Sequence, residues 1–228
     1  MVGIIGAMSV EVNAIKAMVA SPEQKTIGGV EFVRGRIGTT EVVVAQCGIG
    51  KVFAGICAQT MILCYGVDAI LNVGVAGTLS DKVGLLELAV ATEVVEHDMD
   101  TSALGDPVGM ISGLNIVKIP AAKSLVEKIT AAAERIGLPY ACGVIASGDQ
   151  FIADKAKKEW IRDTFDAIAC EMEGAAIGQV AYANGVAFAV IRAISDNADD
   201  AAGALDYPTL CTRAAEGTQR LVEALFLA

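Results

Sequence analysis

The chain has 228 residues, of which 54% are hydrophobic, and carries a net charge of −10. Its length suits one large α/β domain, so we expect a single domain over residues 1–228. The acidic balance, without a cluster of Lys or Arg, argues against nucleic acid as a partner. The uncharged stretch Val52 to Val67 is shorter than the roughly 20 apolar residues of a membrane-spanning helix, so we expect no membrane span.

The chain starts with the run MVGIIGAM, which lacks the basic flank and the small-residue cleavage site of a signal peptide. We therefore expect a cytoplasmic protein. Its six cysteines contain no C-x-x-C pair and are expected to be buried free thiols. Since His97 is the only histidine, a His-rich metal site is excluded, and we expect no metal.

Short apolar runs rich in Val, Ile and Ala recur along the chain. Most are apolar throughout rather than alternating, which indicates strands covered on both faces. The run at 31–46 has a turn at Gly38-Thr39-Thr40 and predicts a hairpin, so we expect a mixed sheet. The predicted buried strands are at 2–7, 42–47, 69–75, 88–95, 142–147, 166–172 and 186–194.

Helical patterns separate these runs, and strands that alternate with helices indicate an α/β fold with a central mixed β-sheet flanked by helices. The segment 97–113 differs from both patterns, because it has three glycines, a proline and no clear period. Loops of this length in compact domains are usually functional or flexible. The predicted helices run from Ser9 to about Met18, Lys51 to Tyr65, Ala121 to Ile136 and Arg213 to Leu227.

Two glycine-rich loops fail the standard nucleotide-binding motifs. The loop CGIGK, at 47–51, is followed by Val52, where a Walker loop needs Ser or Thr. It also has Phe53 where a dinucleotide fingerprint needs Gly or Ala. The loop NVGVAGT, at 72–78, has the same character. Backbone N–H groups in such loops can meet a ligand, but each loop alone is more often only a tight strand–helix turn.

Acidic side chains follow three of the predicted strands: Glu11, the pair Glu171 and Glu173, and Asp196. In α/β sheets, ligands bind beyond the carboxyl ends of the strands. Glu11 is also typical of the first turn of a helix, and Asp196 of a solvated loop. Glu171 and Glu173 lie in an apolar run, where buried carboxylates need partners. Two residues apart, they would share one face of an extended chain.

A set of separated carboxylates suits the cleavage of a glycosidic bond. One acid protonates the leaving group, and another carboxylate activates water against an oxocarbenium-like centre. With a purine as the leaving group, an aspartic acid can protonate a ring nitrogen, and a further carboxylate can bind the sugar hydroxyls. This chemistry needs no cofactor, and we expect none.

Seven motifs taken together resemble, in order and spacing, the 5′-methylthioadenosine/S-adenosylhomocysteine nucleosidases of the nucleoside phosphorylase superfamily. The resemblance implies a single α/β domain that works as a homodimer. It also implies hydrolysis of the adenine–ribose bond in methylthioadenosine and adenosylhomocysteine, with 5′-deoxyadenosine as a further candidate substrate. The motifs are GIIGAMSVEV, CGIGKVFA, NVGVAGT, HDMDTSALG, SGDQFI, CEMEGAAI and VIRAISDNADD.

The same resemblance implies roles for individual residues. Glu11 matches the base that activates water, Asp196 the acid that protonates adenine N7, and Glu173 the residue that holds the ribose hydroxyls. Arg192 would help to position Glu173 and the water. The other substrate-binding residues that the resemblance implies are Met8, Ile49, Ala76, Gly77, Phe151, Ile152, Met172, Ser195 and Tyr207.

Within that set, Phe151 would stack on adenine while the backbone of Ile152 binds the adenine edge. An apolar pocket for the alkylthio group would come from Met8, Ile49 and Tyr207. The irregular segment 97–113 would reach across the homodimer and close the partner's pocket through Leu104.

The sequence also departs from the family pattern, and other interpretations stay open. Val75 offers no polar donor where phosphorylases need them, which favours water over phosphate as the nucleophile. Thr78 and Gln150 bear on details of the pocket. One alternative is a purine nucleoside phosphorylase, another is an aminodeoxyfutalosine nucleosidase, and a third is a binding protein without turnover. The motif HDMD, at 97–100, is typical of an ordinary loop or interface.

Overall fold

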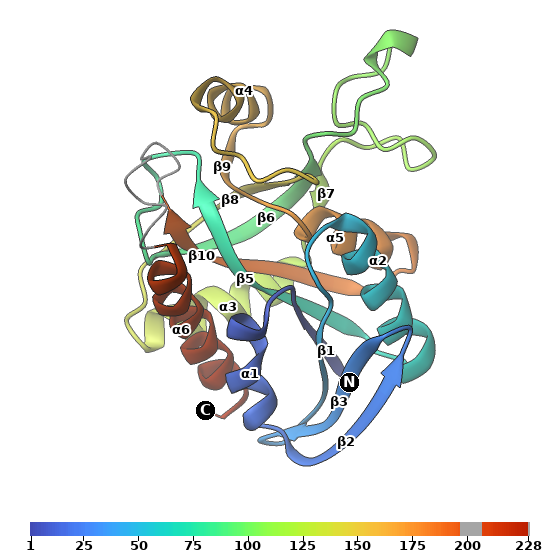
Figure 1. Ribbon diagram of the computed structural model, residues 1–228, viewed down its shortest axis with the longest axis vertical. Coiled ribbons are helices and arrows are strands. Elements are labelled where there is room, and N and C mark those ends of the chain that lie inside the picture. Colours follow the sequence, from blue (N-terminus) through green and yellow to red (C-terminus); the bar gives the residue numbers. More distant parts are fainter. Residues whose placement is uncertain (197–206, 228) are drawn as a thin grey trace.

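The computed structural model describes residues 1–196 and 207–227, with the backbone alone of Tyr207. Its strands belong to one mixed sheet. Figure 1 shows the sheet coloured along the sequence, from blue at the N-terminus to red at the C-terminus. The strands are β1 (Val2–Gly6), β2 (Ala20–Ile27), β3 (Val30–Ile37), β4 (Thr40–Gln46), β5 (Ala69–Thr78), β6 (Leu88–Glu96), β7 (Ile119–Pro120), β8 (Tyr140–Ser147), β9 (Ala167–Glu171) and β10 (Ala187–Asp196).

Five of these strands close into a ring of pairings. Strand β5 pairs with β9, β9 with β8, β8 with β6 and β6 with β10, and β10 pairs again with β5. Strand β1 lies parallel to both β5 and β4, and β3 and β2 follow as antiparallel neighbours. Parallel and antiparallel pairs occur together, so the prediction of a mixed sheet is confirmed.

Five of the α-helices flank the sheet in two groups, while α4 lies apart from both in Figure 1, against β8 and β9. Helices α2 and α5 pack against each other, and Ala58 and Ile177 join them to one core cluster. Helices α1, α3 and α6 share a second cluster, which contains Ile15, Ile129 and Leu221. The predicted α/β fold is therefore confirmed. The α-helices are α1 (Ser9–Ala17), α2 (Lys51–Thr60), α3 (Lys123–Arg135), α4 (Lys155–Phe165), α5 (Gly174–Ala183) and α6 (Tyr207–Phe226).

Two predicted helices differ from the observed ones at their ends. The helical segment from Lys51 to Tyr65 changes type, because α2 ends at Thr60 and a π-helical turn, η1 (Met61–Tyr65), completes it. Helix α6 begins at Tyr207 rather than at Arg213. Its first turn contains the exposed Pro208. Proline is tolerated in the first turn of a helix, but it adds nothing to the apolar stripe from which the helix was predicted.

The sequence prediction missed the strands β2 and β7 and the helices α4 and α5. Strand β2 is an exposed edge strand with the sequence ASPEQKTI, so it lacks the alternation that marks a half-buried strand. Helix α4 is dominated by charged residues. Helix α5 has the sequence GAAIGQVAYA and is mostly buried, so its apolar residues show no amphipathic period.

The cysteines are free thiols, but not all of them are buried. Cys64 and Cys142 are exposed, so the expectation of buried thiols is wrong for these two. Cys64 lies in the π-helical turn, and Cys142 lies near the start of β8, where the strand is only partly covered. Local sequence gives no sign of either exposure, because both residues sit in apolar runs.

The segment 97–113 projects from the body of the molecule in Figure 1. It contains one 3₁₀ turn, η2 (Ser102–Leu104), in which Leu104 is 85% exposed. An isolated bridge joins Ile111 to Ile116 just behind it. Among the described residues, no helix is long and apolar enough to cross a membrane.

Candidate active site

A cavity of about 120 Å³ lies beyond the carboxyl ends of β1, β5, β9 and β10. The acids Glu11, Glu173 and Asp196 meet there, although they come from three different strand ends. This is the place where α/β sheets bind ligands. The cavity is lined by Ala7, Met8, Glu11, Ile49, Val75, Ala76, Gly77, Phe151, Cys170, Glu171, Met172, Glu173, Ser195 and Asp196.

A larger hollow of about 860 Å³ lies between residues 78–85 and helix α4. Its lining contains none of Glu11, Glu173 and Asp196. Convergent acids that can do chemistry identify a site better than volume does. The smaller cavity is therefore the candidate active site.

Glu11 is held by backbone N–H groups. The chain turns from β1 into α1 at Ala7 and Met8, whose N–H groups donate to Oε2 of Glu11 at 2.7 and 2.9 Å. The N–H of Val75, at the end of β5, donates to Oε1 at 3.0 Å. Glu11 is only 1% exposed, so these three donors fix the carboxylate in one position at the cavity wall.

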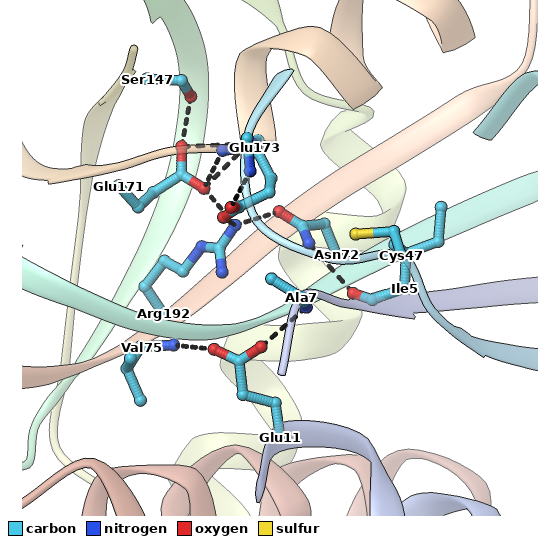
Figure 2. A network of polar contacts seen from close by, with 12 residues as sticks. Ile5, Ala7, Glu11, Cys47, Asn72, Val75, Ser147, Glu171, Glu173 and Arg192 are labelled. Carbon is cyan, nitrogen blue, oxygen red and sulfur yellow. Dashed lines mark hydrogen bonds and ion pairs between the residues drawn. The ribbon is translucent and has the colours of Figure 1, made fainter. Parts of the chain in front are cut away.

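Arg192 supplies the positive charge beneath the acids. It is completely buried and forms an ion pair with Glu171, while Asn72 accepts a further hydrogen bond from it. Its distance to Oε2 of Glu173 is 3.5 Å. Burial alone would lower the pKa of Arg192, but Glu171 and Glu173 raise it, so the guanidinium stays charged. Figure 2 shows Arg192 between the two glutamates and Glu11.

Glu171 is a support for the site rather than its reactive group. Its carboxylate accepts hydrogen bonds from the hydroxyl of Ser147 and from the backbone N–H groups of Glu173 and Gly174, in addition to its ion pair with Arg192. Such a carboxylate has its lone pairs occupied by protein donors. Little capacity remains for a substrate.

Glu173 has fewer partners. Its Oε1 accepts the N–H of Gly50 at 2.9 Å. Burial and the neighbouring Glu171 carboxylate raise the pKa of Glu173 to about 7, against the opposing effect of Arg192. A carboxyl group with free lone pairs, facing a cavity, can accept hydrogen bonds from a ligand.

One detail of the sequence prediction needs correction here. Strand β9 ends at Glu171, and Glu173 is the N-cap residue of α5 with φ −137° and ψ −37°. The two glutamates therefore do not share one face of an extended strand. Arg192 was expected to position Glu173, and it lies 3.5 Å from Oε2 of Glu173, while Glu171 is its closer acidic partner. The helix start decides this, because it turns the chain between the two acids.

Asp196 ends β10 opposite Gly77 of β5. A bulge in the pairing between Ile194 and Asp196 shifts the register there. The hydroxyl of Ser195 donates to Oδ2 of Asp196 at 3.1 Å. A Cβ atom on Gly77 would lie 2.9 Å from Oδ1 of Asp196, so the absence of a side chain at Gly77 makes room for the acid.

The remaining predicted residues are distributed around and beyond the cavity. Ile49 and Phe151 line it and are 55% and 64% exposed, so they form an apolar rim. Ile152 is buried just outside the lining. The side chain of Tyr207 lies outside the described residues. Met8, Ala76, Met172 and Ser195 all line the cavity.

Several contributing residues were not singled out from the sequence. Ala7 and Cys170 line the cavity, and Ser147 and Asn72 support Glu171 and Arg192. Asn72 and Ser147 stand at the start of the motifs NVGVAGT and SGDQFI, so the motifs contained a signal. Their roles depend on contacts across more than 20 residues of sequence, which motifs alone do not give.

His97 is 1% exposed, and neither ring nitrogen has a hydrogen-bond partner. Burial lowers its pKa, so the ring is neutral at physiological pH. Within residues 1–196 and 207–227, no group of three or more His, Cys, Asp or Glu side chains is arranged to hold a metal ion.

Comparison with known proteins agrees with this geometry. A sequence model described as the phosphorylase superfamily matches residues 1–227. A 5′-methylthioadenosine/S-adenosylhomocysteine nucleosidase of Shewanella putrefaciens is 40% identical over 201 residues, 87% of this chain and 87% of that protein. This chain belongs to the 5′-methylthioadenosine/S-adenosylhomocysteine nucleosidases. Another member of this nucleosidase family, from Shewanella halifaxensis, is 38% identical over 200 residues, 87% of each protein.

Solved structures of nucleosidases share the fold closely. A Helicobacter pylori nucleosidase mutant, solved with 5′-methylthioadenosine in its active site, superposes with a TM-score of 0.93 and 36% identity. A futalosine hydrolase of Helicobacter pylori strain 26695 superposes with a TM-score of 0.92 and 35% identity. Each match covers 98% of this chain and 96% of the other. The expected nucleoside phosphorylase-like fold is thus confirmed.

Proposed function

We propose that this chain hydrolyses the N-glycosidic bond of 5′-methylthioadenosine and S-adenosylhomocysteine, releasing adenine and the 5-substituted ribose. The observation that carries the proposal is the meeting of Glu11, Glu173 and Asp196 around one cavity. Family membership supports it. The structural relative solved with 5′-methylthioadenosine supports the same substrate class.

Asp196 is the proposed acid. It stands at the end of β10 with Ser195 donating to one carboxylate oxygen. When protonated, its carboxyl group can pass the proton to N7 of adenine, which makes the base a neutral leaving group. Phe151, on the exposed rim, offers an aromatic face for the adenine ring.

Glu11 is the proposed base, because its carboxylate is fixed at the cavity wall by three backbone donors. A water held against it loses a proton as it attacks the anomeric carbon, where positive charge develops. Glu173 accepts hydrogen bonds from the ribose hydroxyls, using the lone pairs that are not occupied by the N–H of Gly50. Val75 contributes its N–H to Glu11 and an apolar side chain, which offers no donor to a phosphate. This supports water as the nucleophile.

The direct test is to incubate the purified protein with 5′-methylthioadenosine in phosphate-free buffer and to measure free adenine. Adenine release without phosphate is expected. A requirement for phosphate, with ribose 1-phosphate as product, would instead identify a purine nucleoside phosphorylase. Absence of adenine at micromolar enzyme would refute the proposal.

A second candidate substrate is aminodeoxyfutalosine. The structural relative described as a futalosine hydrolase favours it. Its adenine–ribose bond would be cleaved by the same three acids, so the two activities differ only in the 5′ substituent. Comparing kcat/KM for the three substrates under one set of conditions decides which is preferred.

We also propose that the protein acts as a homodimer in which the segment 97–113 closes the partner's cavity. The cavity is smaller than the roughly 300–1,000 Å³ of typical ligand sites and has an apolar rim, so a covering segment would complete it. The segment projects outward in Figure 1. Large exposed apolar side chains also lie on and near α2, as expected for an interaction surface. They are Ile49, Val52, Phe53, Ile56 and Leu63.

The dimer proposal is tested with light scattering and a substitution at the exposed Leu104. A mass of two chains is expected for the wild type. The Leu104→Glu change is expected to raise KM for methylthioadenosine, because it places a charge in the apolar part of the partner's site. A monomeric wild-type enzyme with full activity would contradict the proposal.

For localisation we propose the cytoplasm, which the free cysteines support.

A further inference from the structure

Three loops beside the active site are joined by a closed ring of polar contacts. The backbone N–H of Lys51, after β4, donates to Oδ1 of Asp149 at 2.8 Å. The N–H of Asp149, after β8, donates to Oδ2 of Asp98 at 2.8 Å. Asp98, after β6, accepts the Nζ of Lys51 at 2.7 Å, which closes the ring.

The ring is charged and partly shielded from water. Nζ of Lys51 also donates to Glu96 at 3.0 Å. Burial would lower the pKa of Lys51, but the hydrogen bonds to Asp98 and Glu96 outweigh it and raise the pKa. Burial would raise the pKa of Asp98, but Lys51 lowers it. Both groups are therefore charged around neutral pH, and the ring holds under assay conditions.

Residues next to the ring reach the active site, although Lys51, Asp98 and Asp149 do not line the cavity. Gly50, beside Lys51, donates its N–H to Glu173. Its φ is +101°, and a Cβ atom there would lie 3.0 Å from Oδ1 of Asp149, so this close approach requires glycine.

Two further residues that line the cavity lie next to ring residues in the sequence. Ile49 precedes Gly50, and Phe151 follows Asp149 by two positions. Both line the cavity and are exposed, so the hydrophobic core does not fix them. The position of these two loops relative to each other therefore depends on the polar ring between them.

We propose that Lys51, Asp98 and Asp149 are positioning residues for nucleoside binding. The ring holds the contacts for ribose, at Glu173, and for the base, at Phe151, at a fixed separation. The inference rests on the proposed nucleosidase function. Since Glu11 and Asp196 follow other strands, β1 and β10, the ring is expected to act on substrate binding and not on the chemical step.

The first test is the Lys51→Met variant, which keeps the length of the side chain and removes Nζ. The expected result is a KM for methylthioadenosine about tenfold higher with kcat within about twofold, the pattern of lost uniform binding. Asp98→Asn should give the same pattern, because it removes the charge that holds Lys51. Lys51→Arg keeps the charge and the donors and should restore most of the affinity.

A matched control is Lys123→Met on α3, which breaks the exposed ion pair with Glu127 at 3.8 Å, away from the cavity. Its KM should equal that of the wild type. A second readout is equilibrium binding of methylthioadenosine to the Glu11→Gln protein, with and without Lys51→Met. The added change should raise the Kd about tenfold. Because hydrolysis does not interfere in this background, and because a small loss of stability does not change the Kd of a folded protein, this result would report on substrate binding alone.

The outcomes separate the two proposals. If the wild type releases no adenine, the nucleosidase function fails, while the binding titration still tests the ring. If adenine is released, but folded Lys51→Met and Asp98→Asn proteins keep KM within twofold, the ring inference is overturned. A drop in kcat with unchanged KM in these variants would overturn it as well. If Lys51→Met does not fold, Asp98→Asn decides.

Discussion

Glu11 and Glu173, two of the buried glutamates that line the cavity, are held in contrasting ways. Glu11 receives three backbone N–H donors from two strand ends. Glu173 receives one, from Gly50, and lies beside a second carboxylate and a buried guanidinium. The environment, not the residue type, therefore distinguishes the two glutamates. The fixed carboxylate of Glu11 suits the proposed proton transfer, and the carboxylate of Glu173 keeps lone pairs for the proposed binding of ribose hydroxyls.

The largest expected effect is on the Glu11 side. The Glu11→Gln variant keeps the size of the side chain but cannot take a proton, so kcat should fall about 10²–10⁴-fold. Binding of methylthioadenosine should persist, because Glu173 and the rim are unchanged. Stopped-time adenine assays with a binding titration check both halves. Turnover near the wild-type rate would remove Glu11 from the mechanism and end the contrast.

Next in size is the support on the Glu173 side. Glu171→Gln removes the closest charged partner of Arg192 and leaves it the longer contact with Glu173, and breaking a buried ion pair typically costs about 3–5 kcal/mol of folding free energy. The variant should therefore unfold at a markedly lower urea concentration. Asp68→Asn, which breaks an exposed pair with the N-terminal amine, serves as the control and should change little. A stable Glu171→Gln protein would show that Glu171 is dispensable.

A smaller effect follows from the pKa of Glu173 near 7. Its ionised form is the better acceptor for two ribose hydroxyls, and this form is lost as the pH falls through 7. The Kd of the Glu11→Gln protein for methylthioadenosine should thus rise about tenfold from pH 7.5 to pH 6. Isothermal titration at several pH values measures this. A Kd independent of pH in that range would show that the protonation of Glu173 does not control binding.

The smallest expected effect is on stability. A pKa raised in the folded state means that the protonated Glu173 is favoured by folding, and this stability is present at low pH and lost as the pH rises through about 7. Glu173→Gln avoids the buried charge, so its Tm should exceed that of the wild type at pH 8, by about 2–4 °C for each kcal/mol gained. At pH 4, below the ordinary glutamate pKa of 4.5, the difference should nearly vanish. A lower Tm at pH 8 would mean that the Arg192 contact dominates.

Much of the site was predictable from the sequence, for a physical reason. Buried strands are short apolar runs, and polar side chains that follow them must stand at a sheet end. This placed Glu11 and Asp196 in one region, and the structure brings both to the cavity. The fold class followed from the alternation of strands and helices. Helix α5 and strand β2 lacked such a period, so they were missed.

The sequence by itself thus determined the fold class and the acids at the strand ends, because local periodicity encodes burial. Only the tertiary structure decided how the acids are used. The turn into α5 separates Glu171 from Glu173, and the buried Arg192 selects Glu171 as its partner. The ring joins Lys51 to Asp98, 47 positions further along the chain, and to Asp149, 98 positions further along. Such long-range contacts arise when strands from distant parts of the chain become neighbours in the sheet, which no local pattern records.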